Sequence, residues 1–204
     1  MRDERYHAVA ITLHWLIAAL VVINLILGFG HERVDRATMQ QMMWWHKSIG
    51  ITVFLLTLVR LGWRLTHPIP PLPLDMPNWQ KLAARANHWA FYVLLITLPL
   101  LGWLLTSASP SNRPIPFYGL FQWPFIPWVH GLPKDEAKEL AGLFGEAHET
   151  VAKITLALVA IHVAAALHHI FVRKDEVGHH RLPFLRSPRA TKPIGTDPVE
   201  PGLQ

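Results

Sequence analysis

Histidines carry the clearest chemical signal in this sequence, because several imidazoles fall inside or at the rims of long apolar stretches. His148 and His162 share one stretch, while His14 and His46 belong to two earlier ones. Interfacial histidines are often merely solvated, but ionisable groups at membrane depth are rare and usually functional. Two imidazoles on one iron fill both axial positions of a haem and leave only electron transfer to it. The residue types therefore indicate haem ligation.

The spacing of His148 and His162 indicates two cofactors. Fourteen residues of α-helix return to within about 40° of the starting direction and rise about 21 Å. That separation is too long for one metal ion but suits two haems stacked across a bilayer. With alternating helix directions, depth pairs His14 with His162 and His46 with His148. His169 lies only about 20° off the same face, and spacing does not decide between it and His162.

Four helices are needed to position these side chains. Residues 8–29, 88–109 and 154–172 are uncharged runs of about 20 residues, the length that crosses a bilayer. A shorter run, 48–59, reaches spanning length if Lys47 and Arg60 snorkel at its ends. We predict an all-α, four-transmembrane-helix bundle in residues 1–175. The expected helices are about 7–30, 40–66, 83–109 and 134–173, and 176–204 is expected to be a basic, disordered tail.

The composition agrees with a membrane protein. Of 204 residues, 51% are hydrophobic and 16% are charged, whereas soluble proteins have about 25% charged residues. Nine tryptophans suit two lipid–water interfaces, and the lack of cysteine excludes disulfides, thiolate metal sites and thioether-linked haem. The net charge of +5 comes mainly from loops and tails beside the apolar runs. We therefore expect membrane lipid, and no nucleic acid, as a partner.

The distribution of basic residues predicts the orientation. The side that holds the N-terminus, the 60–87 connection and the C-terminal tail carries roughly twice as many Lys and Arg residues as the other. Both termini are therefore expected to be cytoplasmic. Residues 68–77 are proline-rich and are expected to form an extended link. The aromatic segment 114–129 is expected to lie as a flap at the outer interface.

A few charged residues are further candidates for cofactor binding. Arg60, Arg64 and His88 lie near the expected inner face, where haem propionates would end, and arginine binds carboxylates in a bidentate manner. Simple anchoring by the positive-inside rule explains them equally well. Lys47, beside His46, is expected either to meet an outer propionate or an anion, or only to snorkel.

The sequence resembles the bacterial cytochrome b561 family, di-haem four-helix cytochromes related to the membrane b subunits of hydrogenases and formate dehydrogenases. The resemblance covers roughly residues 6–175 and all four helices in order. It is carried by TLHWLI (12–17), HKSIG (46–50), LVRLGWRL (58–65), HWAFYVLLITLPLLGW (88–103), AHE (147–149) and IHVAAALHH with FVRKD (161–175). It implies axial ligands at His14, His46, His148 and His162, two haem b groups and a bacterial inner-membrane location.

Three functions follow as hypotheses. The first is an electron carrier that exchanges electrons with the quinone pool, for which the resemblance implies ubiquinone as a substrate and superoxide as a specialised donor at the outer face. The second is a membrane-anchor b subunit of a hydrogenase or dehydrogenase complex. The third is a transporter with a histidine-lined ion path, which the absence of Asp and Glu from the three uncharged spans disfavours. The sequence names neither the donor or acceptor protein nor the oligomeric state, and a homodimer stays an alternative.

Overall fold

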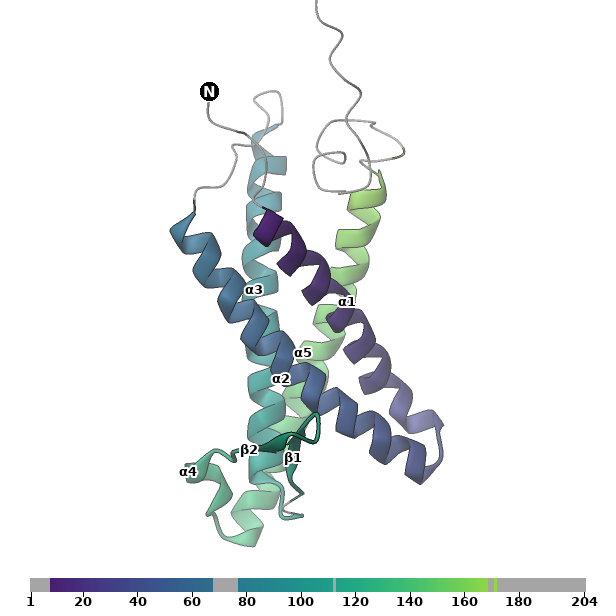
Figure 1. The fold of residues 1–204 in the computed structure, drawn as a ribbon, viewed down its shortest axis with the longest axis vertical. Helices are drawn as coiled ribbons and strands as arrows, with labels where there is room; N and C mark the ends of the chain where they lie inside the picture. Colours follow the sequence, from purple (N-terminus) through teal and green to yellow (C-terminus); the bar gives the residue numbers. More distant parts are fainter. Residues whose placement is uncertain (1–7, 68–76, 112, 169–170, 172–204) are drawn as a thin grey trace, which may run out of the picture.

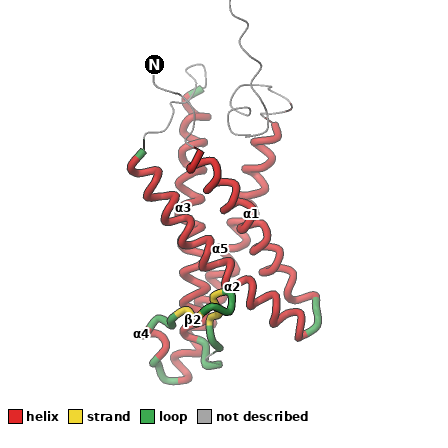
Figure 2. Tube along the Cα trace, in the orientation of Figure 1, coloured by secondary structure: helices red, strands yellow, loops and turns green. Residues whose placement is uncertain are grey.

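Long helices dominate the computed structural model, which describes residues 8–67, 77–111, 113–168 and 171 (Figure 1). The long elements are α1 (Ala8–Gly30), α2 (Arg36–Thr66), α3 (Asn78–Ala108) and α5 (Lys134–His168). Within the described residues, these are the four helices long and apolar enough to cross a membrane. The predicted all-α fold with four membrane spans is confirmed. The colours of Figure 1 show that successive long helices alternate in direction. Figure 2 shows the strands and loops of the described residues at the helix ends, most of them between α3 and α5.

Two helices begin earlier than the ranges expected from the sequence. α2 starts at Arg36, because the Asp35 carboxylate accepts hydrogen bonds from the backbone N–H groups of Ala37 and Thr38 and so caps the helix. α3 starts directly after Pro77. The expected tail 176–204, the last residues of the fourth expected helix and most of the 68–77 link lie outside the described residues.

The helices pack as two pairs. α1 packs along α2, α3 packs along α5, and α2 and α3 join the pairs. The buried core is small and apolar, formed by Ile17, Val21, Ile49, Val53 and Leu95. α5 makes far fewer close backbone contacts with α1 and α2 than with α3. The space between α5 and the α1–α2 pair is therefore wider than at an ordinary helix–helix contact, and side chains in it have more room.

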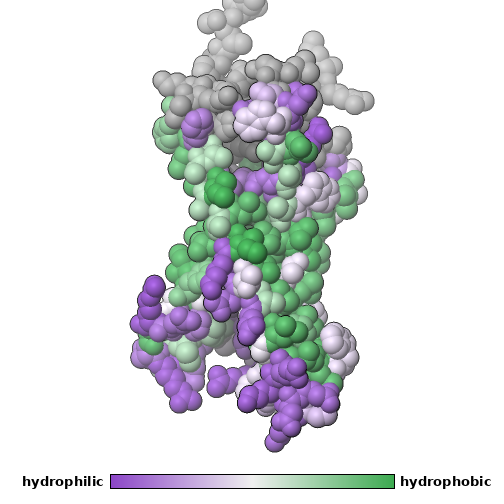
Figure 3. Space-filling view, turned by 180° about the vertical axis from the view of Figure 1, so that it is seen from behind, coloured by the Kyte–Doolittle hydropathy of each residue, from purple (hydrophilic) through white to green (hydrophobic). Residues whose placement is uncertain are grey.

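The surface of the helices suits a lipid environment. Large apolar side chains are exposed along all four helices, with Ile26 at 64%, Val93 at 61% and Ile161 at 65% of their full accessibility. On the face shown in Figure 3, the middle of the molecule is mostly hydrophobic and hydrophilic residues lie mainly toward the ends. In a soluble protein such exposure would be unfavourable, whereas in a bilayer it is the expected state.

An ordered aromatic hairpin connects α3 to α5. β1 (Ile115–Phe117) and β2 (Phe121–Trp123) are antiparallel, with Phe117 opposite Phe121. The turn uses positive φ angles at Tyr118 (52°) and Gly119 (76°). The short helix α4 (Pro127–His130) follows. The aromatic segment expected to form a flap is thus a folded element.

Hydrogen bonds fix this hairpin to the helix that carries His46. The fully buried Ser48 hydroxyl lies 2.9 Å from the carbonyl oxygen of Pro116 and accepts the N–H of Tyr118 at 3.1 Å. The hydroxyl groups of Thr52 and Tyr118 are 2.9 Å apart. On the other side, the Trp103 indole N–H donates to the carbonyl of Pro124 at 2.8 Å. The hairpin therefore bridges α2 and α3 at one end of the bundle.

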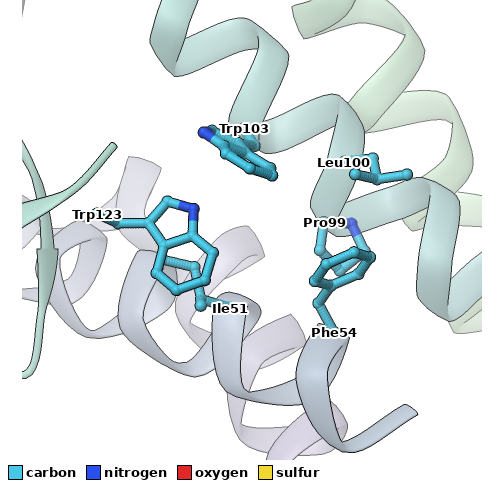
Figure 4. A pocket seen from close by; sticks show the side chains of 6 residues that line it. All are labelled: Ile51, Phe54, Pro99, Leu100, Trp103 and Trp123. Atoms are coloured by element: carbon cyan, nitrogen blue, oxygen red, sulfur yellow. The ribbon is translucent and has the colours of Figure 1, made fainter. Parts of the chain in front are cut away.

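Apolar packing completes the attachment of the hairpin. Trp123 lies over the junction of α2 and α3, beside Trp103 and Ile51 (Figure 4). The pocket that they share with Phe54, Pro99 and Leu100 leaves a volume of about 10 Å³, barely enough for one water molecule. In this conformation it is a packing gap and not a ligand site.

Candidate functional site: two facing histidine pairs

The structure brings the four histidines together as two facing pairs. His46 of α2 faces His148 of α5 with ring centroids 6.1 Å apart. His14 of α1 faces His162 of α5 with ring centroids 6.3 Å apart. We call the first the hairpin-side pair and the second the far-side pair. Both pairs lie where α5 stands away from the first helix pair, at two levels separated by the 14 residues between His148 and His162.

The ring separations fit one metal ion between each pair. A metal–imidazole bond is about 2.0–2.1 Å and the ligating nitrogen lies about 1.2 Å from the ring centre, so two imidazoles that face each other across one ion have centres about 6.4 Å apart. Both observed separations lie within a few tenths of an ångström of this value. Within the described part of the chain, no group of three or more His, Cys, Asp or Glu residues is placed to hold a metal ion. Two histidine ligands per ion are the set that would hold a haem.

Backbone carbonyls orient the hairpin-side pair. The Nδ1 atom of His46 lies 3.1 Å from the carbonyl oxygen of Asn24 on α1, and that of His148 lies 3.0 Å from the carbonyl oxygen of Leu98 on α3. A carbonyl oxygen can only accept, so each Nδ1 carries the proton. Each Nε2 then keeps its lone pair, which is the form that ligates a metal.

A side chain orients His162 in the far-side pair. The amide nitrogen Nδ2 of Asn87 lies 3.0 Å from Nδ1 of His162, and the Phe91 ring packs edge-on against His162 with a centroid distance of 5.2 Å. A rotation of the Asn87 amide by 180° exchanges its nitrogen and oxygen. The oxygen then accepts the Nδ1–H of His162, as the backbone carbonyls do for His46 and His148. Sequence reasoning missed Asn87, which carries no signal beyond its place beside His88.

The other predicted site residues have defined positions. Arg60 lies over the Tyr92 ring at 5.8 Å from its centroid, and Arg64 lies over the Trp89 ring at 5.9 Å. His88 donates from Nδ1 to the carbonyl of Ala84 in its own helix at 2.7 Å. Both arginines therefore lie along the α2–α3 contact.

Lys47 has a different setting. It is half-buried beside His46, near enough to Arg113 for the two positive charges to repel each other. This places two cations at the hairpin end of the bundle. His169, the alternative to His162, lies outside the described residues.

A four-span helical bundle with facing imidazole pairs at two levels defines a membrane cytochrome, and the residues present fit the haem that such a protein holds. The profile of the family described as prokaryotic cytochrome b561 matches residues 5–179. The chain belongs to this family. Its function is membrane electron transfer, membership implies b-type haem, and the protein is a multi-pass protein of the bacterial inner membrane.

Curated relatives agree along nearly the whole chain. Cytochrome b561 homolog 2 of Escherichia coli K12 is 33% identical over 181 residues, covering 85% of this chain and 88% of the relative. Cytochrome b561 homolog 1 of the same organism is 30% identical, covering 88% and 98%. A protein of Yersinia pestis named probable superoxide oxidase CybB is 28% identical, covering 90% and 98%.

Proposed function

We propose that the chain carries electrons across the inner membrane through two b-type haems, one held by the hairpin-side pair and one by the far-side pair. The observation that carries the proposal is the spacing of each ring pair, 6.1 Å and 6.3 Å. A haem held by both histidines of a pair would supply reversible one-electron transfer. The carbonyl groups of Asn24 and Leu98 would hold His46 and His148 in the tautomer that ligates the iron.

Arg60 is proposed to bind a propionate of the far-side haem. It lies 14 residues after His46 on α2, so it projects from nearly the same helix face about 21 Å further along. That is the interval between His148 and His162 on α5. A guanidinium at this level can pair with a carboxylate in a bidentate manner. Arg64 and His88 are further candidates for this contact.

We further propose superoxide as the electron donor at the hairpin end and ubiquinone as the acceptor. With both termini cytoplasmic, as the distribution of basic residues predicts, the hairpin end faces the periplasm. Lys47 and Arg113 there would attract a small anion, and the name of the relative in Yersinia pestis points to the same donor. Two superoxide anions oxidised to oxygen supply two electrons, which with two protons reduce one quinone to quinol.

Superoxide-driven quinone reduction by the purified protein tests this proposal. A xanthine/xanthine oxidase mixture supplies superoxide, and the ultraviolet absorbance of a short-chain ubiquinone reports its reduction. We expect quinone reduction that superoxide dismutase abolishes and that slows as ionic strength rises, because screening weakens the attraction of the anion. Lys47→Gln should slow it, while Lys138→Gln, on the exposed start of α5, should not.

The outcome also separates the alternatives. A haem-loaded chain that reduces no quinone under these conditions would contradict the superoxide proposal and favour an anchor subunit that needs a partner enzyme. A preparation without any haem would contradict electron transfer through these histidines altogether.

A further inference from the structure

The two hydrogen bonds that orient the hairpin-side pair share one local arrangement. His46 donates to the carbonyl of Asn24, and Gly28 follows Asn24 by four residues on α1. His148 donates to the carbonyl of Leu98, and Gly102 follows Leu98 by four residues on α3. In a helix, residues four apart lie one above the other. Each imidazole therefore reaches its carbonyl beside a position that has no side chain.

A methyl group at either position would crowd the neighbouring histidine ring. A Cβ atom on Gly28 would lie 3.1 Å from Cε1 and 3.4 Å from Nδ1 of His46. A Cβ atom on Gly102 would lie 3.0 Å from Cε1 and 3.3 Å from Nδ1 of His148. Carbon atoms prefer separations of about 3.5–4.0 Å, so the ring would have to move away. We expect this movement to disturb its hydrogen bond to the carbonyl, which is 3.1 Å long for His46 and 3.0 Å long for His148.

The other helical glycines in the described residues would not meet a ring of either histidine pair; a Cβ on Gly30 would lie 3.1 Å from Cε of Met42, and one on Gly50 would lie 3.5 Å from Nδ2 of Asn24. Gly62 on α2 and Gly142 on α5 would place a Cβ with nothing within 4 Å, and Gly145 would make an ordinary contact of 3.7 Å with Leu105. Glycine is less favourable than alanine inside a helix. Among the described glycines, only Gly28 and Gly102 would bring a Cβ within 4 Å of a histidine ring of either pair.

We infer that Gly28 and Gly102 are positioning residues for the hairpin-side haem, acting through His46 and His148. The inference rests on the proposed function, since it concerns the imidazoles that hold the metal. The glycines let each ring lie close enough to the neighbouring helix to donate its Nδ1–H to a backbone carbonyl. That hydrogen bond fixes the ring orientation and raises the basicity of the ligating nitrogen. No described glycine would bring a Cβ within 4 Å of His14 or His162, so the far-side pair should not depend on Gly28 and Gly102.

The test compares Gly28→Ala and Gly102→Ala with Gly62→Ala and Gly142→Ala, which add the same methyl group where there is space. Haem per chain is measured by pyridine haemochrome, the two potentials by redox titration of the visible spectrum, and the ligand geometry by the low-spin ferric EPR signals. EPR and the potentials report the ligand ring itself, which a general loss of helix stability would not change selectively.

The first two variants should each alter one haem only. We expect either loss of one of two haems or a tenfold weakening of ferric relative to ferrous binding, which raises its potential by about 59 mV. One EPR signal should move with it. The two control variants should keep both haems, both potentials and both signals.

A paired substitution covers the case in which Gly102→Ala accumulates poorly. With His148 also replaced by Ala, the added methyl has no ring to meet, so the double variant should accumulate and bind haem as His148→Ala alone does. If it instead remained as poor as Gly102→Ala, the ring contact would not be the cause and the inference would be wrong.

Other outcomes are equally distinct. Two haems with unchanged potentials and signals in both glycine variants would overturn the inference and leave the proposed function intact. A haem-free wild-type protein would overturn both.

Discussion

Replacing Asn87 by Leu should raise the potential of one haem and leave the other unchanged. Asn87 lies 3.0 Å from Nδ1 of His162, whereas His46 and His148 donate to backbone carbonyls that no substitution removes. Outer-shell partners of metal-ligating histidines are worth about 10–100-fold in affinity. If that loss falls on the ferric form, each tenfold step is about 59 mV for a one-electron couple. We therefore expect a rise of roughly 60–120 mV.

The assay is a potentiometric titration of the haem absorption band in the purified protein. Wild type should give two one-electron components, and Asn87→Leu should shift one of them upward. Asn87→Asp is the matched control, because a carboxylate is a stronger acceptor for the Nδ1–H and should shift the same component downward. An unchanged titration in both variants, or a shift of both components together, would refute the role assigned to Asn87.

Three further predictions test other parts of the molecule. His148→Ala and His162→Ala should each reduce the haem content from two per chain to about one, because the two levels are about 21 Å apart and distant sites act independently; haem quantitation that still gave two in either variant would contradict the ligand assignment. Ser48→Ala should lower the thermal midpoint and speed proteolysis within residues 115–123, since the Pro116 carbonyl and Tyr118 N–H lose a buried partner worth about 1–3 kcal/mol; an unchanged cleavage rate would argue against this anchor. The Thr38 hydroxyl holds the pKa of Asp35 below its usual value, so the cap of α2 should stabilise the protein above the ordinary carboxyl pKa and lose that effect as pH falls through the lowered one; Asp35→Ala should therefore reduce the thermal midpoint at neutral pH and flatten its acid dependence.

Much of the architecture could be predicted from the sequence because bilayer thickness fixes helix length. The uncharged runs 8–29, 88–109 and 154–172 each fall inside one observed helix or extend just past its described end. The weaker second span, flanked by Lys47 and Arg60, is also a continuous helix. The early start of α2 depends on the Asp35 side chain, which caps the helix by hydrogen bonds to its first backbone N–H groups. Hydrophobic periodicity does not predict such a cap.

The pairing of the histidines by depth could also be predicted from the sequence, because helix geometry is regular. A rise of about 1.5 Å per residue converts sequence position into depth, and depth brings His14 to the level of His162 and His46 to the level of His148. The contacts between side chains and backbone of different helices could not be predicted from the sequence. The carbonyls of Asn24 and Leu98, the amide of Asn87 and the space beside Gly28 and Gly102 depend on helix rotation and tilt, which packing sets. One signal was present: Gly28 follows His14 by 14 residues, the same interval that separates His148 from His162.

The hairpin marks another limit of sequence reasoning. Its aromatic residues indicate an interface location, but the attachment of Tyr118 to Ser48 and Thr52 joins segments about 70 residues apart. Such contacts between distant segments leave no local pattern. They matter because they fold the hairpin against α2, the helix that carries His46.

The central claim is that each facing histidine pair holds one haem b. Pyridine haemochrome quantitation of purified protein, expressed with added haem precursor, measures this most directly. The account predicts two haem b per chain, with low-spin bis-imidazole EPR signals from both. A ratio of one or none, or a high-spin signal from an iron with an open axial position, would contradict it.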